Sequence, residues 1–105
     1  MSYIVSPNAE SELDAAWIYI ARESGDAEIA TRFIEAFYGY FGLLDRHQRL
    51  GRVREDIAGG VRSMPAQGYV IFYSILDDND ILILNVIHGS RDLGSVRTWR
   101  PQKPN

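Results

Sequence analysis

The fold of this 105-residue chain is decided by residues 60–87, which read GVRSMPAQGYVIFYSILDDNDILILNVI. Runs rich in β-branched and aromatic residues occupy 61–64, 69–76 and 81–87, and the turn-forming segments PAQG and DDND separate them. This spacing predicts three strands in an antiparallel meander.

The middle strand, residues 69–76, is apolar on both of its alternating faces. We expect one face to rest on helices and the other to need separate cover. The two faces consist of Val70, Phe72 and Leu76, and of Tyr69, Ile71, Tyr73 and Ile75.

Upstream of these strands the pattern is helical. A short apolar strand at residues 2–6 leads into Ser6-Pro7, a capping hydroxyl followed by a proline suited to the first helical position. The turn at residues 24–26, Ser-Gly-Asp, separates this helix from a second one. Gly39 and Gly42 weaken the end of the second helix, which we expect to fray or bend. The apolar stripes are Ala9, Leu13, Ala16, Trp17 and Ile20, then Ala30, Phe33, Ile34, Phe37, Phe41 and Leu44.

The expected fold class is therefore α+β. A two-helix antiparallel hairpin packs on a small, twisted, mainly antiparallel four-stranded sheet. One domain spans residues 1–92, and residues 93–105 form a C-terminal tail that is extended or ordered by a partner.

Several function classes are excluded by composition and motif. The chain has no cysteine, which removes disulfides and thiolate metal sites and suits a cytoplasmic protein. We find no signal peptide and no apolar run of the roughly 20 residues that span a bilayer. No phosphate-binding loop, dinucleotide fingerprint, catalytic triad or zinc-ligand spacing occurs, so we expect no cofactor and no metal.

Charge is distributed unevenly along the chain. Residues 1–45 hold eight acids against two arginines, whereas residues 46–76 hold five arginines against two acids. Arg52, Arg54 and Arg62 are expected to border an anionic groove on the open face of the sheet or to form a solvated basic face. An acidic partner segment would complement them.

Four stretches carry a resemblance to a known family. These are the N-terminal strand and helix ending in WIYI, then LGRVREDI at 50–57, then GVRSMP followed by YVIFY, and finally IHGSRD at 87–92. From Tyr3 to Asp92 the chain resembles the ParE toxins of the RelE/ParE superfamily. The resemblance implies a helix hairpin on a sheet, and a toxin of a type II toxin-antitoxin module of the plasmid-stabilising kind. It also implies inhibition of DNA gyrase and neutralisation by a ParD-like antitoxin in a hetero-oligomer, with DNA contacted only through the antitoxin.

A RelE-like, ribosome-dependent messenger RNA endoribonuclease is the alternative. Arg54, Arg62 and Arg91 would hold phosphate, and His88 would act as acid or base. The lysine-rich set typical of RelE is missing, since Lys103 is the sole lysine. A structural role at the end of the last strand is the favoured interpretation of His88 and Arg91.

The partner-binding residues expected from the sequence combine arginines with aromatics. Tyr19, Tyr38 and Tyr40 lie off the helical stripes and suit an interface or a half-buried position. Trp99 suits an anchor for a partner or a contact with the domain itself. The full set of expected partner contacts is Arg52, Arg54, Arg62, Tyr69, Tyr73 and Trp99.

Overall fold

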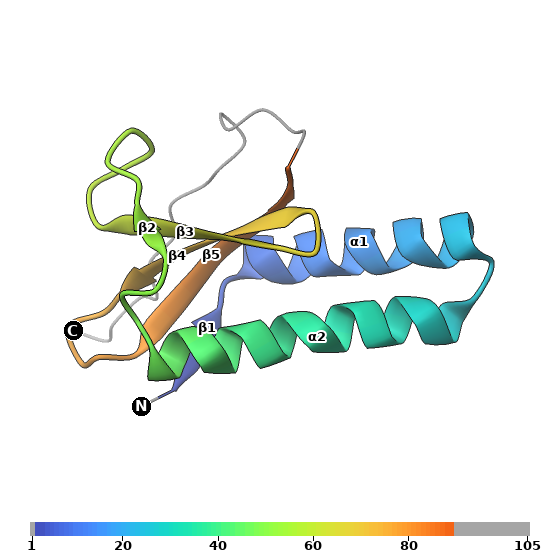
Figure 1. Cartoon of the computed structure of the whole chain (residues 1–105), viewed down its shortest axis with the longest axis horizontal. Coiled ribbons are helices and arrows are strands. Elements are labelled where there is room, and N and C mark those ends of the chain that lie inside the picture. Colours follow the sequence, from blue (N-terminus) through green and yellow to red (C-terminus); the bar gives the residue numbers. More distant parts are fainter. Residues whose placement is uncertain (1, 90–105) are drawn as a thin grey trace.

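Two antiparallel helices lie against one face of a five-stranded sheet with the order β1-β5-β4-β3-β2 (Figure 1). The computed structural model describes residues 2–89. The elements are β1 Tyr3–Val5, α1 Pro7–Ser24, α2 Ala27–Arg46, β2 Arg52–Val53, β3 Val61–Ala66, β4 Tyr69–Ile75 and β5 Ile81–His88.

The expected α+β class and the antiparallel meander are confirmed, with one strand more than predicted. The additional strand is β2, which pairs antiparallel with β3 through Arg52 opposite Ser63 and Val53 opposite Arg62. A strand of two residues is too short to produce a period-two pattern, so it left no signal in the sequence.

The N-terminal strand closes the opposite edge of the sheet. β1 pairs parallel with β5, with Tyr3 opposite Ile81. Ser6 then joins three elements: its N–H donates to Ile83 O (2.9 Å), its hydroxyl donates to Leu84 O (2.7 Å), and the same hydroxyl accepts from Ala9 N (3.0 Å). The predicted cap of α1 therefore also ties the helix to the last strand.

The turn between the helices follows the prediction. Gly25 ends α1 with a left-handed φ of 69°, and the Asp26 carboxylate accepts from Glu28 N at 2.8 Å and Ile29 N at 3.4 Å. The expected fraying of α2 is wrong, because the helix continues through both glycines to Arg46. Phe41 and Leu44 are fully buried beside those glycines and hold the final turns in place.

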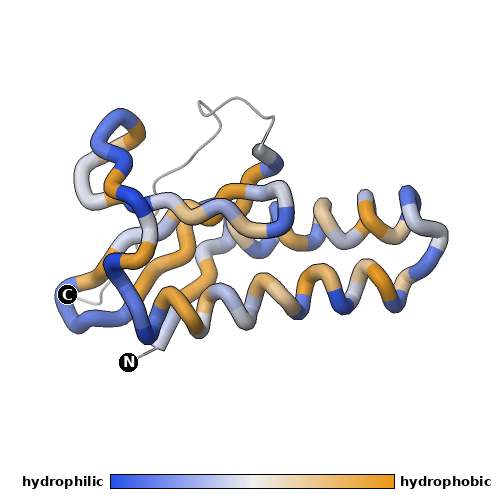
Figure 2. Tube along the Cα trace, in the orientation of Figure 1, coloured by the Kyte–Doolittle hydropathy of each residue, from blue (hydrophilic) through white to orange (hydrophobic). Residues whose placement is uncertain are grey.

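The core between the helices and the sheet contains one of the two apolar faces of β4. Ile71 and Tyr73 of β4 face the helices, where they meet Leu13 of α1 and Phe37 and Phe41 of α2. Hydrophobic positions recur along both helices and through the strands (Figure 2).

The other face of β4 contributes to a second apolar cluster that contains no residue of α1 or α2. Among the described residues, Ile57 and Ala58 of the segment between β2 and β3 pack against it, as does Ile4 of β1. The expected division of β4 into two apolar faces is confirmed. The buried members of this cluster are Val61, Phe72, Leu82, Leu84 and Ile87.

The turn between β3 and β4 is shorter than predicted. β3 extends through Pro65 to Ala66, and Gln67 and Gly68 alone form the connection, with φ of 55° and 80°. Two positive φ angles match the right-handed twist of a hairpin. Proline is tolerated because β2 pairs only with Arg62 and Ser63, so Pro65 lies beyond it on an outer edge.

The far ends of both helices project past the sheet (Figure 1). Ile18 and Tyr19 in the second half of α1 and Ile29 in the first turn of α2 are exposed by 46%, 55% and 42%. Neither helix is long and apolar enough to cross a bilayer, as judged over residues 2–89.

Candidate functional site

The three arginines expected to border one groove lie on two different faces of the sheet. Partners in an antiparallel pair point to the same side. Arg52 pairs with Ser63, which pairs with Phe72 of the second apolar cluster. Arg62 pairs with Tyr73, which faces the helices. The prediction of a single groove formed by these arginines on the open face is therefore wrong.

Arg54 is occupied by contacts within the chain. Its guanidinium donates to both carboxylate oxygens of Asp56, at 3.0 and 2.8 Å, and to the Ser63 hydroxyl at 3.4 Å. The same group lies 5.8 Å from the ring centre of Phe72. The hydrogen bond between the two side chains raises the pKa of Arg54 and lowers the pKa of Asp56. Arg54 thus covers Phe72 with its charge already balanced.

Arg62 holds the backbone of a loop. Its Nη1 donates to Gly51 O at 2.8 Å and, more weakly, to Arg49 O at 3.5 Å. A guanidinium that serves two backbone carbonyls has fewer donors left for a phosphate or a partner carboxylate.

Tyr73 is a buried structural residue, which corrects its predicted role as a partner contact. Its side chain is fully buried, and the hydroxyl donates to Gln48 O at 2.7 Å and accepts from Gly51 N at 2.8 Å. The pKa of Tyr73 is raised, because the effect of burial outweighs the lowering effects of the Gly51 N–H and of Arg62. The phenol reaches from the sheet to the loop and is not at the surface.

Tyr69 and His88 form one end of a groove between α1 and β5. The His88 ring packs edge-on against Tyr69 at 5.2 Å, and Tyr69 packs on Phe33 and Phe37. The groove has a volume of about 480 Å³. Its lining is Ser11, Glu12, Ala15, Ala16, Tyr19, Tyr69, Val86, Ile87 and His88.

Glu12 is a feature of this groove that the sequence did not indicate. Its Oε1 accepts from Val86 N at 2.9 Å and from Asn85 Nδ2 at 3.2 Å, so the carboxylate takes the place of a neighbouring strand along β5. The contact joins residues 74 apart, and no local pattern reports such a distance.

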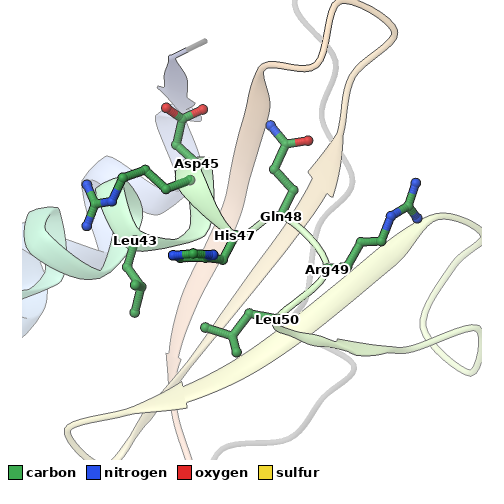
Figure 3. A pocket seen from close by; sticks show the side chains of 7 residues that line it. Leu43, Asp45, His47, Gln48, Arg49 and Leu50 are labelled. Carbon is green, nitrogen blue, oxygen red and sulfur yellow. The ribbon is translucent and has the colours of Figure 1, made fainter.

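A second hollow lies where α2 ends, in residues 46–52, which we call the arginine loop. The hollow measures about 690 Å³ and is lined by Leu43, Asp45, Arg46, His47, Gln48, Arg49 and Leu50. Leu43, His47 and Leu50 point to one side of the loop, and Asp45 and Gln48 point to the other (Figure 3). The recurrence of arginine at positions 46, 49 and 52 is a sequence signal for this site, but the prediction grouped Arg52 with Arg54 and Arg62 instead.

The residues expected for a ribonuclease are not gathered at one point. Arg62 lies opposite Tyr73 and His88 lies opposite Tyr69. Tyr69 and Tyr73 are four residues apart on β4, which separates His88 from Arg62 by about 13 Å along the strands. His88 on β5 and Arg62 on β3 are also two strand spacings apart, about 10 Å across the sheet. Arg54 is on the other face, and Arg91 lies outside the described residues, as does Trp99. Across residues 2–89, no group of three or more histidine or acidic side chains is placed to hold a metal ion.

Comparisons with known proteins agree on one family. A family profile described as the ParE toxin of the type II toxin-antitoxin system parDE matches residues 3–93. Proteins named Toxin ParE1 in two strains of Mycobacterium tuberculosis, CDC 1551 / Oshkosh and H37Rv, are each 23% identical over 91 residues. Each alignment covers 87% of this chain and 92% of the relative.

A solved structure titled as the chromosomal ParDE TA system from P. aeruginosa has a similar fold. The superposition gives a TM-score of 0.72 at 22% identity and covers 84% of this chain and 95% of the other. At this identity, the likeness concerns the fold.

Proposed function

Because the chain belongs to the ParE toxin family of type II toxin-antitoxin systems, we propose that it inhibits DNA gyrase and that a ParD-like antitoxin neutralises it. The observation that carries the proposal is the family match over residues 3–93. This role would keep the protein in the cytoplasm, in line with its lack of cysteine.

The geometry supports a toxin that acts by binding rather than by cleaving RNA. Acid-base cleavage requires a proton acceptor, a proton donor and cations within hydrogen-bond reach of one phosphate. Here Arg54 is paired with Asp56, Arg62 serves backbone carbonyls, and His88 is more than one strand away from both. Gyrase inhibition requires a shaped surface without a catalytic group.

The groove between α1 and β5 is the surface we propose for the antitoxin. Its lining combines small residues, Ser11 and Ala15, with the aromatic rings of Tyr19 and Tyr69. Tyr19 is 55% exposed, and tyrosine is enriched at protein interfaces. A hetero-oligomer of this kind would bury roughly 2,000 Å² or more.

Co-expression with the neighbouring reading frame tests the antitoxin. We expect a complex that survives purification, and we expect Ala15→Glu to break it by placing a bulky charge in the groove. Ala27→Glu is the matched control, because Ala27 is also an exposed helical alanine and lies outside the groove. If the complex still forms with Ala15→Glu, the antitoxin binds a surface other than this groove.

Purified protein tests the target. We expect it to block supercoiling by gyrase and to leave messenger RNA intact on translating ribosomes, and we expect His88→Ala to behave like the wild type in both assays. Ribosome-dependent cleavage that disappears in His88→Ala, with an unchanged circular dichroism spectrum, would establish the ribonuclease instead.

A further inference from the structure

The arginine loop carries three cations without a partner carboxylate. Arg46, Arg49 and Arg52 are all exposed, and none of them forms an ion pair with an acid in the described part of the chain. Arg52 is close enough to Asp56 to contribute to lowering the pKa of that carboxyl, but Asp56 is paired with Arg54. Asp45 points to the opposite side of the loop from Leu43 and Leu50 (Figure 3). The loop therefore carries three exposed positive charges without an ion-pair partner in the described part of the chain, next to the acidic hairpin of residues 77–80 that the Gln48 side chain contacts at Asn79 O.

Two leucines line the hollow beside these cations. Leu50 is 57% exposed, the largest exposure among the large hydrophobic side chains in residues 2–89, and it lines the hollow together with Leu43. A single exposed leucine is common on protein surfaces. Here it points to the same side as Leu43 and the His47 ring, while the stretch leaving α2 is otherwise strongly hydrophilic (Figures 2 and 3).

The backbone of the loop is fixed by long-range hydrogen bonds. Tyr73 binds Gln48 O and Gly51 N, Arg62 binds Gly51 O, and the Gln48 side chain donates to Asn79 O. Two local hydrogen bonds also order the start of the loop: His47 N donates to Leu43 O at 2.9 Å, and Leu50 N donates to His47 O at 3.0 Å. A surface that is already ordered loses less conformational entropy when it binds.

We propose that the arginine loop is a docking surface for an acidic peptide segment that carries an apolar side chain. The carboxylates would pair with Arg46 and Arg49, and the apolar side chain would enter the hollow beside Leu43 and Leu50. Nucleic acid suits the site less well, because a phosphate backbone offers no apolar group to pack against the two leucines. In the toxin-antitoxin role the segment belongs to the antitoxin, and this assignment alone rests on the proposed function.

Tyr73 and Arg62 act on this surface as positioning residues. Neither needs to touch the peptide, because both hold the backbone that presents Arg49 and Leu50. Both residues were expected to be partner contacts, and the structure assigns them this indirect part.

Binding of defined probes to the purified chain tests the proposal without the antitoxin. The probes are a fluorescein-labelled peptide of mixed glutamate and leucine, an all-glutamate peptide of the same length, and a single-stranded oligonucleotide of equal charge, each followed by fluorescence anisotropy. We expect the mixed peptide to bind most tightly. Arg46→Glu/Arg49→Glu should weaken it about tenfold or more.

Matched variants separate the loop from general charge. Arg22→Glu/Arg32→Glu makes the same change on two exposed arginines of the helices and should leave binding unchanged. Leu50→Ser should weaken the mixed peptide several-fold and the all-glutamate peptide little, and Tyr73→Phe should weaken both peptides while the surface charge stays the same.

Three outcomes would overturn the inference. The mixed peptide could fail to bind, the two arginine pairs could give equal losses, or the oligonucleotide could bind more tightly than the peptide with the same dependence on Arg46 and Arg49. If one of these results is obtained but the antitoxin complex still forms normally, the inference fails and the proposed function stands.

Discussion

The turn that enters α2 is held by its own residues, whereas the loop that leaves α2 is held by side chains from β3 and β4. At the first connection, Gly25 takes the left-handed conformation and Asp26 caps the helix that follows. At the second, Tyr73 and Arg62 hold Gln48 and Gly51 from strands that come later in the chain. The first connection needs only local chemistry, and the second exists only when the sheet has formed.

The largest effect that would sharpen this comparison is expected from Gly51→Ala. A Cβ at Gly51 would lie 2.5 Å from Tyr73 Oη and 2.9 Å from Ser63 O, closer than atoms pack. We expect the free energy of unfolding to fall by about 2–3 kcal/mol, as overpacked sites do. Urea denaturation of the purified protein measures it.

Gly25→Ala is the counterpart at the other connection. No atom lies within 4 Å of a Cβ at Gly25, so the only cost is the φ of 69°. That cost is about 1 kcal/mol. If the two substitutions were equally destabilising, the tertiary origin of the second connection would be wrong.

The next largest effect is expected from Tyr73→Phe. The substitution leaves Gln48 O and Gly51 N without their buried partner, and we expect a loss of about 1–2 kcal/mol in the free energy of unfolding. Tyr38→Phe is the control, because Tyr38 is 41% exposed. Thermal unfolding of both variants measures the difference, and equal melting temperatures would contradict the role of the Tyr73 hydroxyl.

A smaller effect is expected from Asp26→Ala at the first connection. Removing the carboxylate leaves Glu28 N and Ile29 N without their acceptor, which costs about 1 kcal/mol for a helix cap. Asp14→Ala, at an exposed position inside α1, should be nearly neutral. Binding of the mixed peptide at the arginine loop should be the same in both variants, since neither touches the second connection.

The smallest effect concerns alkaline pH. Burial raises the pKa of Tyr73 above its ordinary value, so the folded state keeps a proton that the unfolded chain releases as the pH rises through about 10. The stabilisation is complete below that pH and is lost as the pH rises toward the folded pKa. Burial likewise raises the pKa of Tyr38, so the difference between wild type and Tyr73→Phe isolates Tyr73. A pH series in urea that gives parallel curves for the two proteins would contradict the shift.

The sequence predicted the elements that local rules determine. Ser6-Pro7 begins α1, Gly25 and Asp26 separate the helices, and the alternation at Tyr69–Ile75 sets the two faces of β4. Strand β2 and the cap that Glu12 places on β5 were missed, because both depend on partners far along the chain.

The candidate site was predicted less well, for a physical reason. A tyrosine or an arginine at a strand position looks the same in the sequence whether it meets solvent or a loop backbone. Tyr73 and Arg62 turned out to hold the arginine loop, and only the arrangement of β3 and β4 in space decides between the two roles.

The parallel pairing of β1 with β5 means that the sheet can close only after the last described strand has been synthesised. β1, α1 and α2 leave the ribosome first, and the strands that cover Leu13, Phe37 and Phe41 follow. Within the described residues, β1 has no strand to pair with until Ile81–Ile83 have been made. Contacts so distant along the chain form slowly and late. A ribosome that stops before β5 therefore releases a chain that lacks this fold.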